Sequence, residues 1–396
     1  MAVAGVIAEF NPFHNGHKYL LSAARNAAAD GVAVVLGGNF TQRGEPALCD
    51  KHYRAAAALC NGADLVLELP IAFSLATAQT FALGGVGVLS ALGMVDTLVF
   101  GSECGDIARL SAAADAVADP RAETALQEYL QKGLPFPAAR EAAVRQAFGD
   151  AVADVLHSPN DILGLEYLRA VRAYQAPFSC VAVPRVGHAH DAQSPCGAYA
   201  SATLLRKKIR AGEAVSDFMP QNAYEILQTA VLRHEAPSDY AKLDTAVLGF
   251  LRTASPADFT GVPDVSEGIE NRILTAAKTA KTLWAVFDAA KTKRYTHARI
   301  RRVVLAAFLG LKSEMQQNGV PYIRVLGFTE RGKSLLRTAR ETAKLPIVMR
   351  ASDLEVCSPA AQALFRLECK STDIFNLTLP EIRPCGTEMT DNLVRF

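Results

Sequence analysis

Two histidines, His14 and His17, stand three positions apart in the stretch GVIAEFNPFHNGHKYLLSAAR, with Gly16 between them. A neutral imidazole can donate a hydrogen bond to a phosphate oxygen. A pair of them can stabilise the charge that develops during phosphoryl or nucleotidyl transfer. Because glycine has no side chain, a ligand can approach the backbone closely here. The pair therefore predicts a site that acts on a polyphosphate.

Two other roles would also place histidines at this spacing: a metal pair, or a polar helix start. A zinc site needs further ligands, but the eight cysteines form no CxxC pair, and His188 with His190 is the only other close histidine pair. We therefore favour the phosphate site and assign no metal-ligating residue.

The elements around the histidines read as strand, turn and helix. Val3 to Phe10 is a mostly apolar run closed by Asn11-Pro12, and apolar residues recur at helical spacing from about Gly16 onward. Free N–H groups and the positive end of the helix dipole would face the strand's carboxyl end, which suits an anion.

Further short apolar segments alternate with helix-like sequence and read as strands. They lie at residues 32–36, 65–69, 97–100 and 178–183. This alternation predicts an α/β fold with a doubly wound parallel sheet whose ligands sit at the carboxyl ends of the strands. Residues 69–95 carry no charge, but a proline and several glycines favour a helix buried in a globular domain over a membrane span.

Three other places could contribute to the site. Ser201, Thr203 and Arg206 begin a helical pattern that would turn hydroxyls and a guanidinium toward an anion, although for this motif alone a simple helix cap with a solvated basic face would be favoured. Gly101, after the fourth strand, would let a nucleotide approach the backbone, and an ordinary turn glycine is the alternative. Asn160 has helix capping as its default role.

Charge is distributed unevenly along a chain of net charge +1. Residues 271–350 hold 17 Lys/Arg against 4 Asp/Glu, whereas residues 1–270 hold 20 against 29. The densest part, KTKRYTHARIRR at 291–302, interleaves basic and aromatic side chains, which favours RNA binding over a merely solubilising helix face. Its basic residues are Lys291, Lys293, Arg294, Arg299, Arg301 and Arg302.

The length of 396 residues predicts two domains, a nucleotide-binding domain at 1–212 and a mostly helical, basic region at 213–396. The closing segment, 322–396, mixes short strands and helices and is expected to fold back on the first domain. Unpaired cysteine spacing and the lack of a signal-peptide pattern predict a reduced, cytoplasmic protein.

The histidine pattern HxGH and the later SxTxxR resemble the two motifs of the nucleotidyltransferase superfamily. A closer resemblance rests on longer blocks in the same order along most of the chain. They are GVIAEFNPFHNGH, GNFTQRGEPALCDK, GADLVLELP, FGSE, SPNDILGLEYL, ASATLLR and TKRYTHARIRR. Together these blocks are similar to the bacterial tRNA(Met) cytidine acetate ligase family.

The resemblance implies a Rossmann-like nucleotidyltransferase core and an ATP-dependent ligase, with ATP as a substrate, Mg²⁺ beside it, and acetate and elongator tRNA(Met) as partners. Such an enzyme activates acetate as acetyl-adenylate and acetylates the wobble cytidine to N4-acetylcytidine; no membrane is involved. His14 and His17 would be catalytic, and Ser201, Thr203 and Arg206 follow from the superfamily pattern. The implied ATP contacts are Ile7, Ala8, Glu9, Phe10, Asn11, Pro12, Phe13, His14, Asn15, Gly16, His17, Lys18, Tyr19, Leu20, Gly101, Asn160 and Arg185.

One departure and two alternatives stay open. After the fifth strand the sequence RVGHAHD is a residue shorter than the family pattern, so no role is given to His190 and Asp191. A small-molecule nucleotidyltransferase that transfers NMP to a phosphorylated acceptor would share both motifs. An RNA-binding protein whose nucleotide site has lost catalysis is the other alternative.

Overall fold

The computed structural model describes residues 2–28, 30–185 and 195–396. The strands are β1 (Val3–Ala8), β2 (Gly31–Gly37), β3 (Leu65–Leu69), β4 (Thr97–Ser102), β5 (Ser179–Pro184), β6 (Ile323–Phe328), β7 (Ile347–Val348) and β8 (Val394–Arg395).

The α-helices of the first half are α1 (Asn15–Ala27), α2 (Lys51–Leu59), α3 (Ile71–Ser74), α4 (Ala78–Leu92), α5 (Ile107–Ala116), α6 (Pro120–Gln131), α7 (Phe136–Phe148), α8 (Asp150–Ala153) and α9 (Pro159–Ala173). Those of the second half are α10 (Ala202–Arg210), α11 (Gln221–Leu232), α12 (Asp244–Thr253), α13 (Ile269–Ala277), α14 (Leu283–Ala290), α15 (His297–Leu309), α16 (Glu314–Gln317), α17 (Glu330–Thr342), α18 (Pro359–Asn376) and α19 (Thr387–Thr390).

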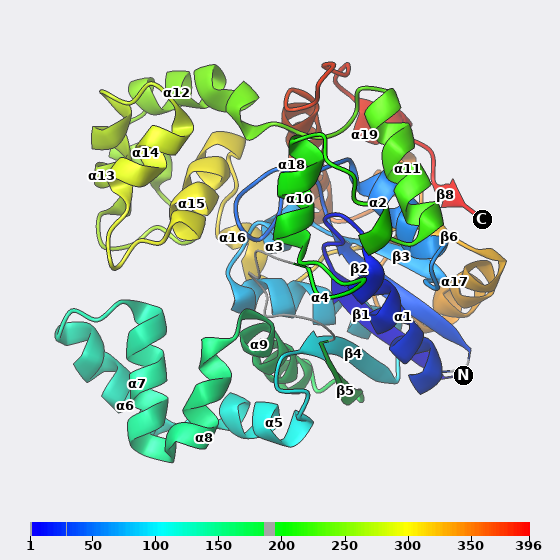
Figure 1. Ribbon diagram of the computed structural model, residues 1–396, viewed down its shortest axis with the longest axis horizontal. Coiled ribbons are helices and arrows are strands. Elements are labelled where there is room, and N and C mark those ends of the chain that lie inside the picture. Colours follow the sequence, from blue (N-terminus) through cyan, green and yellow to red (C-terminus); the bar gives the residue numbers. More distant parts are fainter. Residues whose placement is uncertain (1, 29, 186–194) are drawn as a thin grey trace.

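All the predicted strands lie in one sheet with the order β5-β4-β1-β2-β3-β6-β7 (Figure 1). The five strands of the first half pair in parallel, for example Val6 beside Val34 and Val99 beside Val181. Helices cover the sheet on both sides, so the predicted α/β fold with a doubly wound parallel sheet is confirmed.

The sheet has its topological switch point at β1. From β1 the chain builds outward through β2 and β3, then returns to place β4 and β5 on the other side of β1. Loops that leave β1 and β4 therefore diverge at their carboxyl ends and open the crevice where doubly wound sheets bind ligands. The residues that follow β1 are those of the HxGH stretch.

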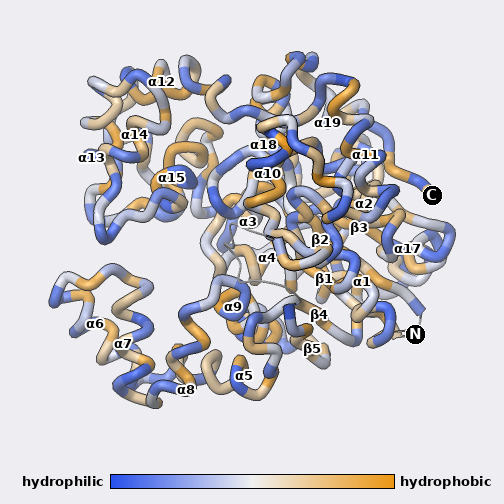
Figure 2. Tube along the Cα trace, in the orientation of Figure 1, coloured by the Kyte–Doolittle hydropathy of each residue, from blue (hydrophilic) through white to orange (hydrophobic). Residues whose placement is uncertain are grey.

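Buried apolar residues explain the central strands. One face of β1 and β2 carries the fully buried residues Ala4, Val6, Val32 and Val34. The residues that alternate with them point to the opposite face of the sheet and are buried as well. A strand covered on both faces needs a continuous apolar run rather than an alternating one. Figure 2 shows these strands as predominantly hydrophobic, while hydrophilic segments concentrate on the outer helices.

The closing segment folds back on the sheet, as its short strands predicted. Strand β6 pairs antiparallel with β3, and β7 and β8 pair with β6. Helices α12–α15 stand apart from the sheet, opposite the pair α6 and α7, whereas α11 packs on α2 beside the sheet (Figure 1). A domain boundary at residue 212 stays a prediction.

Within the described ranges, no helix is long and apolar enough to cross a membrane. The uncharged stretch at 69–95 forms the short helix α3 and the buried helix α4 instead. His188, His190 and Asp191 fall outside the described residues.

Candidate active site

A cavity of about 1220 Å³ opens at the switch point. Its wall is built from the ends of β1, β4 and β5, from the starts of α1, α9 and α10, and from side chains of α6, α7 and α15. His14, His17, Ser201, Thr203 and Arg206 all line it. The two sequence motifs, nearly 190 residues apart, therefore meet around one space.

The two histidines cap helix α1 reciprocally. The Nδ1 atom of His14 accepts a hydrogen bond from the backbone N–H of Gly16 at 3.1 Å, and the Nδ1 atom of His17 accepts one from the backbone N–H of His14 at 3.3 Å. A nitrogen that accepts carries no proton, so in the neutral ring the proton sits on Nε2. Both imidazoles are thus held in the tautomer that donates from Nε2.

Burial keeps both rings neutral. Desolvation, followed by the positive charges of Arg185 and Arg206, lowers the pKa of His14 to about 3. Desolvation, His14 and Arg185 lower the pKa of His17 well below its ordinary value. The rings stack with centroids 3.6 Å apart, an arrangement that two imidazolium ions would resist. The site therefore offers two neutral N–H donors next to two guanidinium groups.

Arg206 connects the two motifs. Its guanidinium donates to the carbonyl oxygen of Asn11 at 2.8 Å and to the Thr203 hydroxyl at 3.2 Å. Ser201 caps α10 by accepting from the backbone N–H of Leu204 at 3.2 Å. The helix start thus faces the cavity with its dipole, as the sequence predicted for an anion site.

Gly101 and Arg185 lie together at the ends of β4 and β5. A side-chain carbon placed on Gly101 would meet only the Arg185 Cγ atom, at 3.9 Å, so the cavity reaches the backbone there. Asn160 also lines the cavity and donates to the Glu103 carboxylate at 2.6 Å. It does not cap α9, because Ser158 holds the cap position and Asn160 lies inside the first turn.

The remaining residues predicted for ATP divide into two groups. Those whose atoms reach the cavity are Ile7, Ala8, Glu9, Phe10, Asn11, Gly16, Tyr19 and Leu20. Pro12, Phe13, Asn15 and Lys18 do not line it. Phe13 is buried against Phe10 with ring centroids 4.9 Å apart, and Asn15 donates to the backbone of Ala198, so both support the loop. A role for these residues in ATP binding stays a prediction.

The loop after β2 contributes cavity residues that were not assigned from the sequence. Thr41, Gln42, Arg43 and Glu45 line the cavity, and the backbone N–H of Gln42 donates to the Glu9 carboxylate at 2.8 Å. This loop follows the carboxyl end of a strand adjacent to β1. Because ligands of doubly wound sheets bind at the carboxyl ends of the strands, the position of this loop in the sequence could have predicted its part in the site.

The predicted RNA-binding residues fall into an exposed group and a group that makes contacts within the protein. Lys291, Lys293 and Arg294 are exposed, and Arg294 reaches the cavity rim. Arg301 is buried and pairs with Glu45 at 3.1 Å, and Arg302 pairs with Asp264 at 2.5 Å. Arg299 donates to the Ser266 hydroxyl at 2.6 Å and lines the cavity with Arg302. An RNA contact for any of the six stays a prediction.

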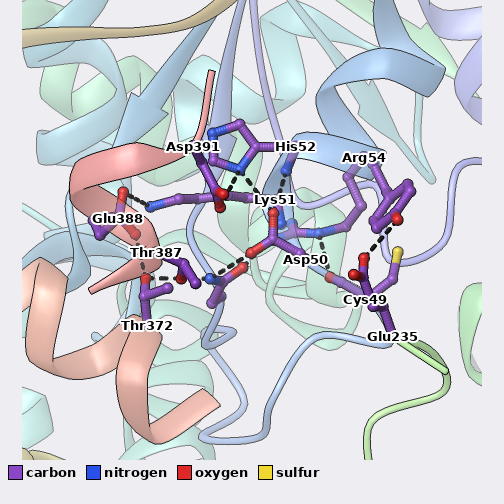
Figure 3. Close-up of polar contacts among 12 residues, drawn as sticks. Cys49, Asp50, Lys51, His52, Arg54, Glu235, Thr372, Thr387, Glu388 and Asp391 are labelled. Atoms are coloured by element: carbon purple, nitrogen blue, oxygen red, sulfur yellow. Dashed lines mark hydrogen bonds and ion pairs between the residues drawn. The ribbon is translucent and has the colours of Figure 1, made fainter. Parts of the chain in front are cut away.

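Part of the block GNFTQRGEPALCDK has a structural task. Lys51 is fully buried and pairs with Glu68. It also pairs with Glu388 at 2.7 Å (Figure 3). Glu388 also pairs with Arg324 and accepts from Thr372. Burial alone would lower the pKa of Lys51, but Glu388 and Glu68 raise it above its ordinary value. These contacts fasten α18 and α19 to the sheet that carries the site.

The comparisons with known proteins agree with this geometry. The model of the family described as HIGH Nucleotidyl Transferase matches residues 1–388. A tRNA(Met) cytidine acetate ligase of Acetivibrio thermocellus is 35% identical over 413 residues and covers 100% of both chains. That of Caldanaerobacter subterraneus subsp. tengcongensis is 36% identical and covers 95% of both.

Solved structures show the same relationship. Apo TmcAL from Thermotoga maritima superposes with a TM-score of 0.95 at 34% identity, and the complex of that protein with alpha-thio ATP gives 0.92 at 33% identity. Both matches cover 100% of each chain. The chain belongs to the HIGH nucleotidyltransferase family, within its group of tRNA(Met) cytidine acetate ligases.

Proposed function

We propose that this protein is an ATP-dependent ligase that acetylates the N4 amine of the wobble cytidine in elongator tRNA(Met). The observation that supports this most strongly is the reciprocal cap, which occupies Nδ1 of both rings and so leaves Nε2–H as the donor of two neutral imidazoles that line the switch-point cavity. Two guanidinium groups stand beside them. Relatives that match over the full length bear the ligase name.

In the first step an acetate oxygen bonds to the α-phosphorus of ATP while the bond to the bridging oxygen breaks and pyrophosphate leaves. His14 and His17 donate hydrogen bonds to the phosphate oxygens, whose charge increases as the bond breaks. Arg185 and Arg206 hold the pyrophosphate as it departs. The step needs positioning and charge stabilisation rather than a covalent nucleophile.

In the second step the cytidine N4 atom attacks the acetyl carbonyl carbon of acetyl-adenylate. The bond from that carbon to the phosphate oxygen breaks, AMP leaves, and the amine loses one proton. Because AMP is a good leaving group, we assign no strong base. The cytidine must first leave the stack of the anticodon loop to enter the cavity.

Mg²⁺ belongs to the proposal as a companion of ATP. Among the described residues no three His, Cys, Asp or Glu side chains gather as a metal site. Magnesium commonly keeps several waters and binds through substrate phosphates, so the residues present fit an ion that arrives with the triphosphate. When bound it would neutralise phosphate charge, and no step depends on a protein ligand to it.

For tRNA, the exposed residues Lys291, Lys293 and Arg294 lie at the cavity rim or beside it and would neutralise backbone phosphates. We retain a cytoplasmic location because ATP, acetate and tRNA meet there.

The test is to incubate elongator tRNA(Met) transcript with the protein, ATP and labelled acetate, and then to analyse the nucleosides by mass. We expect acetylated cytidine, and none in a transcript whose wobble cytidine is replaced by uridine. If neither transcript becomes labelled, the proposal is refuted, and the search moves to phosphorylated small-molecule acceptors.

A further inference from the structure

Helix α9 carries two charged residues that line the cavity and that the proposed mechanism does not use: Glu166, in the block SPNDILGLEYL, and Arg169, just after it. They meet Arg140 of α7 in the wall of the same cavity. The Glu166 carboxylate, whose side chain is 2% exposed, accepts from Arg140 at 2.7 Å and from Arg169 at 2.8 Å. One buried carboxylate thus fixes two guanidinium groups, and the trio keeps one net positive charge.

Each arginine gives this carboxylate a single nitrogen: Nη2 from Arg140 and Nη1 from Arg169. A guanidinium has five N–H donors, and within the described ranges neither side chain makes another hydrogen bond. The side chains of Arg140 and Arg169 are 17% and 29% exposed, and both line the cavity. Their remaining donors are therefore available to a ligand inside it.

The surroundings indicate what that ligand is. The α6 and α7 side of the cavity, which carries Arg140, includes the apolar Leu126, Leu130 and Phe136, the last 52% exposed, together with the polar Glu123 and Gln127. An apolar and aromatic surface next to fixed guanidinium groups suits a nucleotide, whose base stacks while its phosphate is held. A purely structural tie between α7 and α9 would need only one arginine.

The opposite wall strengthens this reading. The basic stretch at 291–302 lines the cavity with three arginines: Arg294, Arg299 and Arg302. The turn after α6 approaches that segment, because a side-chain carbon on Gly133 would lie 3.8 Å from the Arg294 Nη2 atom. Arg299 and Arg302 pair with Asp264, so a strand that enters there would meet Arg294 on this wall and Arg140 with Arg169 on the other.

We infer that Arg140 and Arg169, fixed by Glu166, form a second anion site that binds a phosphodiester of the RNA next to the target cytidine. This inference rests on the proposed function. The site would hold the strand while the base reaches the acetyl group, so it would act on RNA binding and not on acetate activation.

The test compares Arg140→Gln and Arg169→Gln with Arg172→Gln. Arg172 lies one turn further along α9, pairs with the exposed Asp115 at 2.6 Å and does not line the cavity, so its variant removes the same charge elsewhere. Two assays are run on each: acetate-dependent exchange of pyrophosphate into ATP, and acetylation of elongator tRNA(Met) transcript across a salt series.

For Arg140→Gln and Arg169→Gln we expect the KM for tRNA to rise about tenfold. The plot of log affinity against log salt should become shallower by about 0.7, the value for one single-strand phosphate contact. The KM values of these two variants for ATP and acetate in the exchange assay should equal those of the wild type. Arg172→Gln should change neither these values nor the KM for tRNA and its salt dependence.

Two results would overturn the inference. A similar rise in the KM for ATP or acetate would make the trio part of the first step, and unchanged constants throughout would make it only a tie between α7 and α9. If Arg140→Gln does not fold, Arg169→Gln decides, because it leaves the Arg140–Glu166 pair intact. Absence of exchange in the wild type would instead refute the proposed function itself.

Discussion

Replacing His14 by asparagine separates its two tasks. The ring caps α1 through Nδ1, and in the proposed mechanism it donates to the phosphate through Nε2. Asparagine is among the best N-cap residues, so His14→Asn should keep the cap while losing the Nε2 donor. Loss of one preorganised donor to developing charge costs about 2.7–4 kcal/mol in the transition state, which is about 10²–10³-fold in rate.

The assay is acetate-dependent exchange of pyrophosphate into ATP at saturating ATP, with urea unfolding measured on the same preparations. His14→Ala is the matched variant, because it loses both tasks and should unfold about 1 kcal/mol more easily than His14→Asn. Exchange by His14→Asn within tenfold of the wild type would refute the role given to the Nε2 donor.

Four other outcomes follow from the same structure. Burial holds the pKa of His14 at about 3, against 6.5 when the ring is exposed, so between these pH values unfolding takes up a proton. The free energy of unfolding should therefore fall by up to about 1.4 kcal/mol per pH unit as the pH drops through that window. The slope of this fall should be smaller in His14→Asn. Gly101→Val should leave urea unfolding unchanged yet raise the KM for ATP at least tenfold, since the new side chain meets open cavity; an unchanged KM would count against nucleotide contact there. Lys293→Ala with Arg294→Ala should spare exchange, weaken tRNA binding in filter assays and reduce its salt dependence; an unaltered salt slope would exclude them from the interface. Lys51→Met should lower the free energy of unfolding by about 3–5 kcal/mol, because buried carboxylates lose their partner, and a near-neutral effect would contradict the role of this pair in fastening α18 and α19.

The sequence was most informative where structure is local. The apolar run before Asn11 predicted β1, and the change of periodicity near Gly16 predicted α1, which begins at Asn15. Short apolar segments between helices predicted the parallel sheet, because a strand buried on both faces needs them. The site at the strand ends followed from that sheet.

Contacts between distant segments could not be predicted in this way. Arg301 was grouped with the RNA-binding residues because no acidic residue stands near it in sequence, and that spacing gave no sign of its pairing with Glu45 across the fold. Nothing in the sequence around Arg140 indicated that α7 would turn this side chain toward Glu166. The cap function of the histidines depends on ring orientation, which spacing alone does not set.

Acetate-dependent exchange of labelled pyrophosphate into ATP by the wild-type protein, with and without tRNA, tests the central proposal most directly. We predict exchange that requires acetate and proceeds without tRNA, because activation precedes attack by the cytidine. Binding of ATP with no acetate-dependent exchange, under either condition, would contradict the proposal that this cavity makes acetyl-adenylate.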